Sequence, residues 1–86
     1  MTGQRVGEVT HFFGRINVAV IQLSDNLKVG DTVHFLGHGA DFQQEVSSMQ
    51  VEHESIQRGK KGDEVAIKVD KPIKRGTSVF KLTPEG

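Results

Sequence analysis

Apolar and polar residues alternate along much of this chain with a period of two, the repeat that places side chains on opposite faces of a β-strand. The alternation is strict at Val65, Ile67 and Val69. Spacings of three and four, which an amphipathic helix needs, never persist for about 11 residues. The chain is therefore predicted to be all-β. Strands are expected at residues 6–12, 16–23, 32–36, 42–53, 63–69 and 78–82.

Two of these segments depart from simple alternation. In residues 16–23 apolar side chains occupy both odd-numbered and even-numbered positions, so both faces of that strand are expected to be covered. In residues 42–53 the apolar positions change parity once, between Val46 and Met49. A β-bulge or a barrel-corner bend at residues 47–48 would produce that change.

A short motif of glycine, aspartate and valine recurs and marks turns that lead into strands. Residues 30–33 read Gly-Asp-Thr-Val, residues 62–65 read Gly-Asp-Glu-Val, and a weaker copy at 76–79 keeps the glycine and the valine. Glycine reaches the backbone angles of a tight turn, and aspartate can bond the turn's own backbone. Gly30 and Gly62 are therefore predicted to adopt a positive φ.

Several short strands joined by short turns expose few edges when the sheet closes on itself. The sequence thus predicts one domain over residues 1–86, with a closed antiparallel barrel of six strands over residues 6–82. The pattern does not determine the strand order. The predicted core consists of Val18, Val20, Val33, Phe35, Val65 and Ile67.

Composition narrows the function classes. The chain has no cysteine, which excludes disulfides, thiolate zinc sites and a cysteine nucleophile. No apolar run has the length of a signal peptide or approaches the roughly 20 residues of a membrane span. A soluble chain in the cytoplasm, with no membrane partner, is therefore expected.

A formal net charge of zero conceals an uneven distribution. Residues 1–56 hold three Lys and Arg against seven Asp and Glu, whereas residues 57–86 hold eight against four. A basic third of this kind can contact the phosphates of RNA. Lysines at turns and strand edges also discourage aggregation, so the charge alone does not assign a partner. The candidate RNA or partner contacts are Arg58, Lys60, Lys61, Lys74 and Arg75.

Side chains suited to catalysis or metal binding form no recognisable constellation. His34 and His38 lie near Asp41 in the sequence, but intervening loop glycines argue against a shared strand face, and zinc needs three or four converging ligands. Glu52 and Glu54 could pair an acid with a base, although an exposed strand face is the commoner situation. We therefore expect no enzyme activity, no catalytic residue, no metal and no cofactor.

The glycine turns resemble those of a known family. Val6-Gly7-Glu8-Val9, Leu27-Lys28-Val29-Gly30-Asp31 and Gly59-Lys60-Lys61-Gly62-Asp63 are similar to the second domain of translational GTPases, with elongation factor Tu as the type case. The resemblance implies a six-stranded Greek-key barrel that contacts the ribosome or the aminoacyl end of transfer RNA. No phosphate-binding loop of the Gly-x-x-x-x-Gly-Lys type is present, so this chain alone is not expected to bind GTP.

The same resemblance points to an adenosine pocket. Its family positions fall on Gln50, His53 and Glu64, where the family's arginine and asparagine are replaced. Glu64 would add negative charge where an anionic transfer RNA end approaches.

A second resemblance suggests a different partner. The segment Lys28-Val29-Gly30-Asp31-Thr32-Val33 and the segment Ile67-Lys68-Val69-Asp70-Lys71-Pro72 look similar to the accessory barrel appended to collagenase-like peptidases that act in RNA modification. Such a barrel would dock on a catalytic domain. Two functions therefore remain open: a non-catalytic module that binds RNA or the ribosome, and a protein-docking accessory domain.

Overall fold

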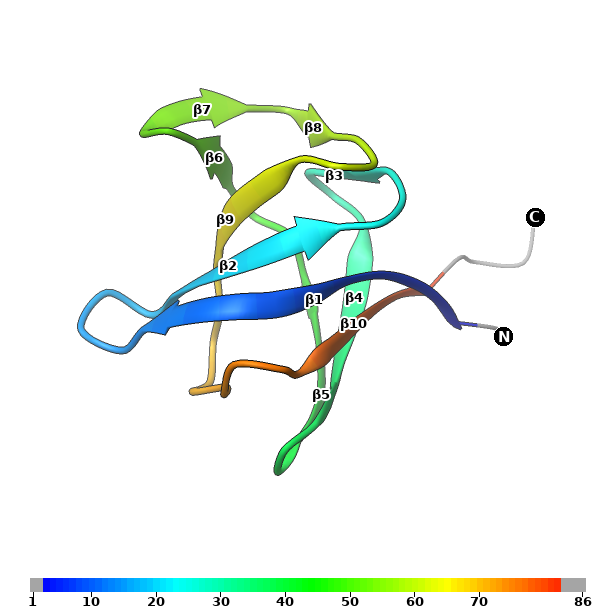
Figure 1. Ribbon diagram of the computed structural model, residues 1–86, viewed down its shortest axis with the longest axis vertical. Coiled ribbons are helices and arrows are strands. Elements are labelled where there is room, and N and C mark those ends of the chain that lie inside the picture. The colour runs from blue at the N-terminus through cyan, green and yellow to red at the C-terminus, as the bar shows by residue number, and fades with distance from the viewer. Residues whose placement is uncertain (1–2, 83–86) are drawn as a thin grey trace.

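The computed structural model describes residues 3–82, and every regular element in that range is a β-strand (Figure 1). All strand pairs are antiparallel, so the predicted all-β antiparallel class is confirmed. The strands are β1 (Gly3–Phe13), β2 (Val18–Leu23), β3 (Leu27–Lys28), β4 (Thr32–Gly37), β5 (Ala40–Glu45), β6 (Met49–Val51), β7 (Glu54–Ile56), β8 (Arg58–Gly59), β9 (Glu64–Lys68) and β10 (Ser78–Leu82).

The larger sheet is open, which corrects the predicted closed six-stranded barrel. Its eight strands follow the order β5-β4-β10-β1-β2-β9-β6-β7, and β3 and β8 form a separate two-stranded sheet. Because β5 and β7 stand at the two ends of this order and do not pair with each other, the hydrogen-bonded ladder does not close.

A side chain bridges the gap beside β5. The Gln44 Nε2 amide donates to the Lys68 carbonyl at 2.8 Å, and the Gln44 Oε1 accepts from the Asp70 backbone N–H at 2.8 Å. Gln44 is only 8% exposed. A primary amide carries a donor and an acceptor side by side, as a peptide group does, so it can substitute for ladder bonds that the strand itself does not make.

The segment predicted as one long strand at residues 42–53 is divided, which corrects that prediction. β5 pairs with β4, whereas β6 pairs with β9 and β7. The change of parity therefore marks an exchange of partner strands across residues 46–48 and not a bulge within one strand. Glu52 and His53 then form a hairpin turn with φ of 51° and 69°. A two-residue turn with positive φ normally uses Asn and Gly, so this one carried no recognisable signal.

Fully buried apolar side chains form one cluster between the strands. Val33 and Phe35 of β4 belong to it, as do Val65 and Ile67 of β9, which confirms four predicted core residues. Val18 and Val20 are only half-buried, so their assignment to the core was wrong. The buried face of β2 instead carries Ala19, Ile21 and Leu23.

The reason lies in β2 itself. This strand is apolar on both faces, so alternation does not show which face points inward. Its pairing with β1 on one side and β9 on the other decides the face, and pairing between distant strands cannot be read from the residues of β2 alone.

Replacing Gln44 with glutamate tests the side-chain bridge. In Gln44→Glu a carboxylate oxygen would face the Lys68 carbonyl in place of the Nε2 donor. We expect the free energy of unfolding to fall by about 1–3 kcal/mol, because a buried acceptor loses its partner. Urea denaturation at neutral pH measures this loss. Gln43→Glu makes the same chemical change at an exposed neighbour and should have little effect. Equal losses in both variants would contradict the bridge.

Gly7 tests the close approach of β1 and β2. A Cβ at this position would lie 2.6 Å from the Gln22 carbonyl oxygen and 2.7 Å from Ile21 Cγ2. Gly7→Ala is expected to lower the free energy of unfolding by about 1–3 kcal/mol, because the backbone of β2 must shift. Gly14→Ala serves as the control, since its Cβ would meet only Phe12 at 3.6 Å. Thermal unfolding of the two variants gives the comparison, and a Gly7→Ala midpoint equal to the control would refute the clash.

Candidate functional site

The turn between β3 and β4 is closed by its own aspartate. The Asp31 N–H donates to the Lys28 carbonyl at 3.1 Å, and the Asp31 Oδ2 accepts the Lys28 N–H at 3.0 Å. Gly30 has φ of 99°, as predicted. The same turn clamps the residue after β5, because the Gly30 N–H donates to the Val46 carbonyl at 2.9 Å and the Val46 N–H donates to the Asp31 carbonyl at 2.8 Å.

The turn between β8 and β9 repeats this geometry bond for bond. The Asp63 N–H donates to the Lys60 carbonyl at 2.9 Å, and the Asp63 Oδ2 accepts the Lys60 N–H at 3.1 Å. Gly62 has φ of 93°, again as predicted. This turn clamps the end of β2: the Gly62 N–H donates to the Leu23 carbonyl at 2.9 Å, and the Leu23 N–H donates to the Asp63 carbonyl at 2.8 Å.

The two turns are related by a local two-fold arrangement. β3 and β8 pair with each other through Leu27 opposite Gly59. One constant offset in the sequence carries Leu27 onto Gly59, Lys28 onto Lys60 and, beyond the turns, Val33 of β4 onto Val65 of β9. The repeated Gly-Asp-x-Val motif is therefore a repeated strand-turn-strand unit, and its two copies meet at the β3–β8 ladder.

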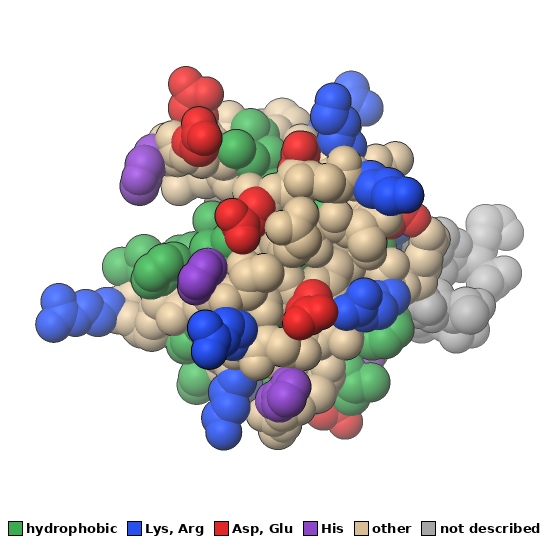
Figure 2. Space-filling model, viewed as in Figure 1, with side chains coloured by type: hydrophobic (Ala, Val, Ile, Leu, Met, Phe, Trp, Pro, Cys, Tyr) green, Lys and Arg blue, Asp and Glu red, His purple; other side chains and the backbone are tan. Residues whose placement is uncertain are grey.

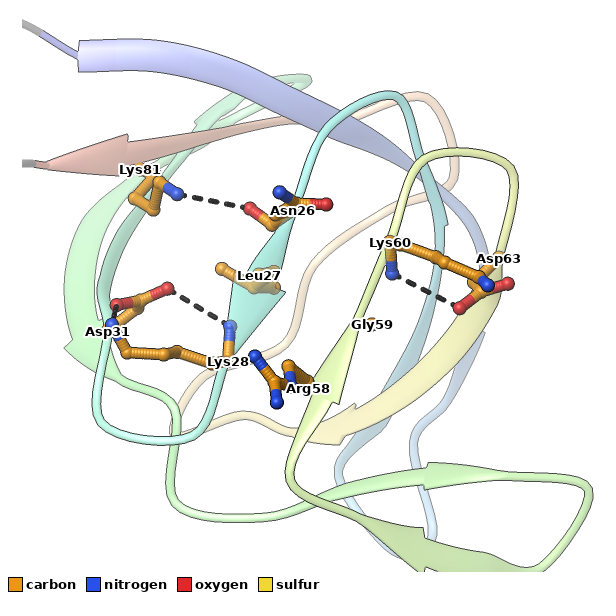
Figure 3. A pocket seen from close by; sticks show the side chains of 9 residues that line it. All are labelled: Asn26, Leu27, Lys28, Asp31, Arg58, Gly59, Lys60, Asp63 and Lys81. Atoms are coloured by element: carbon orange, nitrogen blue, oxygen red, sulfur yellow. Dashed lines mark hydrogen bonds and ion pairs between the residues drawn. The ribbon is translucent and has the colours of Figure 1, made fainter.

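A hollow with a volume of about 630 Å³ lies where the two copies meet (Figure 3). Its walls come from β3, β8, the two turns and the end of β10. Leu27 and its register partner Gly59 both face the core: Leu27 is buried, and a Cβ at Gly59 would lie 2.7 Å from Leu23 Cδ1 and 3.0 Å from Val65 Cγ1. The lining residues are Asn26, Leu27, Lys28, Asp31, Arg58, Gly59, Lys60, Asp63 and Lys81.

The hollow is predominantly cationic. Four of its lining side chains are basic and two are acidic. Asp31 and Asp63 each accept a backbone N–H within their own turn, which commits an oxygen of each carboxylate. The Lys28 Nζ lies 3.6 Å from the Asp31 Oδ1, and the Lys81 Nζ donates to the Asn26 carbonyl at 3.2 Å.

The five predicted cationic contacts fall into two places. Arg58 and Lys60 line this hollow, and Lys61 lies in the adjoining turn. Lys74 and Arg75 line a different hollow, in the segment that precedes β10, which lies away from β8 in Figure 1. The structure therefore does not gather the five into one surface.

The three positions of the predicted adenosine pocket are exposed. Gln50 lies in β6, and His53 lies in the β6–β7 turn. The Glu64 carboxylate, at the start of β9, accepts the Thr10 hydroxyl at 3.1 Å.

Two basic residues of the hollow, Lys28 and Lys81, are not among the five candidate contacts. Lys28 occupies the same place in its turn as Lys60, so aligning the two copies of the motif would have identified it. Lys81 belongs to the basic segment of residues 57–86, but nothing in the local sequence places it beside Arg58. It reaches the hollow because β10 pairs with β4 in the middle of the sheet order, a long-range contact that the local sequence does not encode.

The two histidines considered as metal ligands, His34 and His38, contact different residues. The His34 Nε2 lies 2.6 Å from the Asp41 Oδ1, while the His38 ring packs against Gly76. Among residues 3–82, no three His, Asp or Glu side chains gather in a way that could hold a metal ion. Nor does this part of the chain contain a helix long and apolar enough to cross a membrane.

A second surface feature is the hairpin formed by β1 and β2, which projects beyond the sheet (Figure 1). At its end Phe13 is 51% exposed and Ile16 is 62% exposed. The His11 and Phe13 rings stack with centroids 6.4 Å apart. Figure 2 shows hydrophobic side chains along this projection and a Lys or Arg side chain at its outer end. Exposed apolar groups that lie together in this way are typical of interaction sites.

Comparison with known proteins identifies the fold. The C-terminal domain of a protein described as a U32 peptidase from Geobacillus thermoleovorans matches with a TM-score of 0.87 and 20% identity, covering 93% of both chains. The selenomethionine variant of that domain matches with a TM-score of 0.86 and 21% identity, covering 91% of this chain and 99% of the other. This likeness shows that the two domains share a fold. No family model matches the chain.

One curated relative matches in sequence. An uncharacterised protease of Methanocaldococcus jannaschii is 35% identical over 78 residues, which make up 90% of this chain and 19% of the relative. The chain thus spans about a fifth of the length of the curated relative that it matches.

These findings correct the first resemblance. The solved structures that share the fold are C-terminal domains of a U32 peptidase, the sequence relative is named a protease, and neither is the second domain of a translation factor. The identification as an elongation-factor-like barrel was therefore wrong. The second resemblance, to an accessory domain of collagenase-like peptidases, is the one that the comparisons support.

Proposed function

We propose that this chain is a non-catalytic accessory domain that docks on a larger peptidase-like body. The observation that carries the proposal is the match to an uncharacterised protease, which uses nearly the whole of this chain but only 19% of the relative. We propose that the docking surface binds the remaining four-fifths of such a protein. The partner is thus a protein, and this proposal gives no role to the ribosome.

The chemistry of the cationic hollow favours a non-catalytic role. A general base needs a carboxylate or imidazole that is free to take a proton from a substrate. Both carboxylates of the hollow instead accept backbone N–H groups that hold their turns closed. Their removal would disturb the fold, which is the behaviour of structural groups.

The projecting hairpin is the docking surface that we propose. Phe13 and Ile16 expose more than half of their surface while the ladder between β1 and β2 holds their backbone in place. Removing this apolar surface from water favours association, and a preformed hairpin loses little conformational entropy on binding. Leu36 is also exposed, at 44%, but it lies on β4.

The proposal is tested by capture from an extract of the chain's own cells. We expect the unmodified chain to retain a protein whose sequence resembles the part of the M. jannaschii relative outside the matched segment, identified by mass spectrometry. The double variant Phe13→Ser, Ile16→Ser should retain at least about ten-fold less of it, because two partly exposed apolar side chains lose their burial in the interface.

The matched control is Leu36→Ser, which removes one exposed hydrophobic side chain from β4 and should leave capture unchanged. Unfolding curves of all three proteins exclude a loss of fold as the cause. Capture of ribosomal proteins in place of the expected partner would contradict the proposal. Equal capture by the double variant and the unmodified chain would show that the hairpin is not the docking surface.

A further inference from the structure

The β3–β8 ladder places two positive charges directly opposite each other. Lys28 and Arg58 are register partners in this two-stranded sheet. Like charges at opposed positions of an antiparallel pair repel and destabilise the pair. The positive charge of Lys28 is partly compensated, because its Nζ lies 3.6 Å from the Asp31 Oδ1. The Arg58 guanidinium, by contrast, has no hydrogen-bond or ion-pair partner within residues 3–82.

Two further cations line the same hollow from other segments. Lys81 comes from β10, where its Nζ is held by the Asn26 carbonyl at 3.2 Å, whereas Lys60 comes from the second turn and its side chain extends toward Asp63, away from Arg58 (Figure 3). With two carboxylates against four basic side chains, the lining has a formal charge of +2. A concave surface lined by one sign of charge concentrates the opposite ion.

We propose that this hollow binds a compact phosphate-type anion, such as the phosphate end of a small phosphate ester. The Arg58 guanidinium supplies a planar fork that matches two phosphate oxygens, and Lys28 and Lys81 supply point charges beside it. An anion between Lys28 and Arg58 relieves the repulsion across the ladder. The site goes beyond the proposed docking role and does not depend on it, because the hairpin is a different surface.

The distribution of cations favours a compact ligand over a long nucleic-acid strand. A bound strand needs cations along its track to neutralise successive phosphates. Lys74 and Arg75 line another hollow in the segment before β10, away from the β3–β8 ladder. Four cations instead line one hollow of about 630 Å³, which accommodates a pyrophosphate or a small ester.

Titration of the full chain with inorganic pyrophosphate, followed by two-dimensional 1H–15N NMR at constant ionic strength, tests the site. We expect saturable shifts that centre on Lys28, Arg58 and Lys81. The double variant Arg58→Gln, Lys81→Gln should bind at least about ten-fold more weakly, because charge-assisted hydrogen bonds are lost. Its spectrum without ligand establishes that the fold is retained.

The matched control is the double variant Lys74→Gln, Arg75→Gln, which removes the same charge elsewhere and should bind pyrophosphate as the unmodified chain does. An equal loss in both double variants would show a general charge effect and overturn the site. Shifts reproduced by sodium chloride at the same ionic strength would overturn it too. Binding of a single-stranded oligonucleotide without binding of pyrophosphate would replace the compact anion with a nucleic-acid track.

Discussion

The structure depends on one backbone arrangement that occurs twice, a turn in which a positive-φ glycine and an aspartate carboxylate close the chain on itself. Asp31 and Asp63 each take a backbone N–H three residues earlier, and each turn then exchanges two backbone bonds with the end of another strand. A ladder of two residues per strand is far too short to be stable alone. The β3–β8 ladder persists because a clamped turn follows each of its strands.

This arrangement also determines what the surface offers. Each turn's aspartate commits an oxygen to its own backbone, and the four basic side chains of the lining outnumber the two carboxylates, so the hollow between β3 and β8 is cationic. The hairpin of β1 and β2 carries the opposite character, with Phe13 and Ile16 exposed. The apolar projection, which we propose as the protein-docking surface, thus belongs to the larger sheet, and the charged hollow, which we propose as an anion site, lies at the two-stranded sheet.

Much of the architecture could be predicted because it follows from local chemistry. The alternation at β4 and β9 identified Val33, Phe35, Val65 and Ile67 as core, and the Gly-Asp motif identified two positive-φ glycines. The structural predictions that were wrong depend on pairing between strands that are distant in the sequence. The sequence did not reveal the inward face of β2, the exchange of partners between β5 and β6, or the open sheet order.

Of the two family resemblances, the one to a translation factor was wrong for a related reason. The resemblance to a translation factor rested on glycine turns and alternation, which are requirements of small β-sheets and are shared by proteins with different partners. In the candidate site, Arg58 and Lys60 were found from charge, and Lys28 could have been found from the repeat. Lys81 could not, because only the folded sheet brings β10 to the hollow.

A double-mutant cycle in urea unfolding tests most directly whether the paired turns support the fold. We predict that Asp31→Ala and Asp63→Ala each lower the free energy of unfolding by about 0.5–2 kcal/mol, as the loss of a helix-capping carboxylate does. The double variant should deviate from additivity by at least about 0.5 kcal/mol, because both turns support one ladder. Asp70→Ala, at an exposed aspartate after β9, is the control. Losses no larger than that control, or strictly additive losses, would contradict the account.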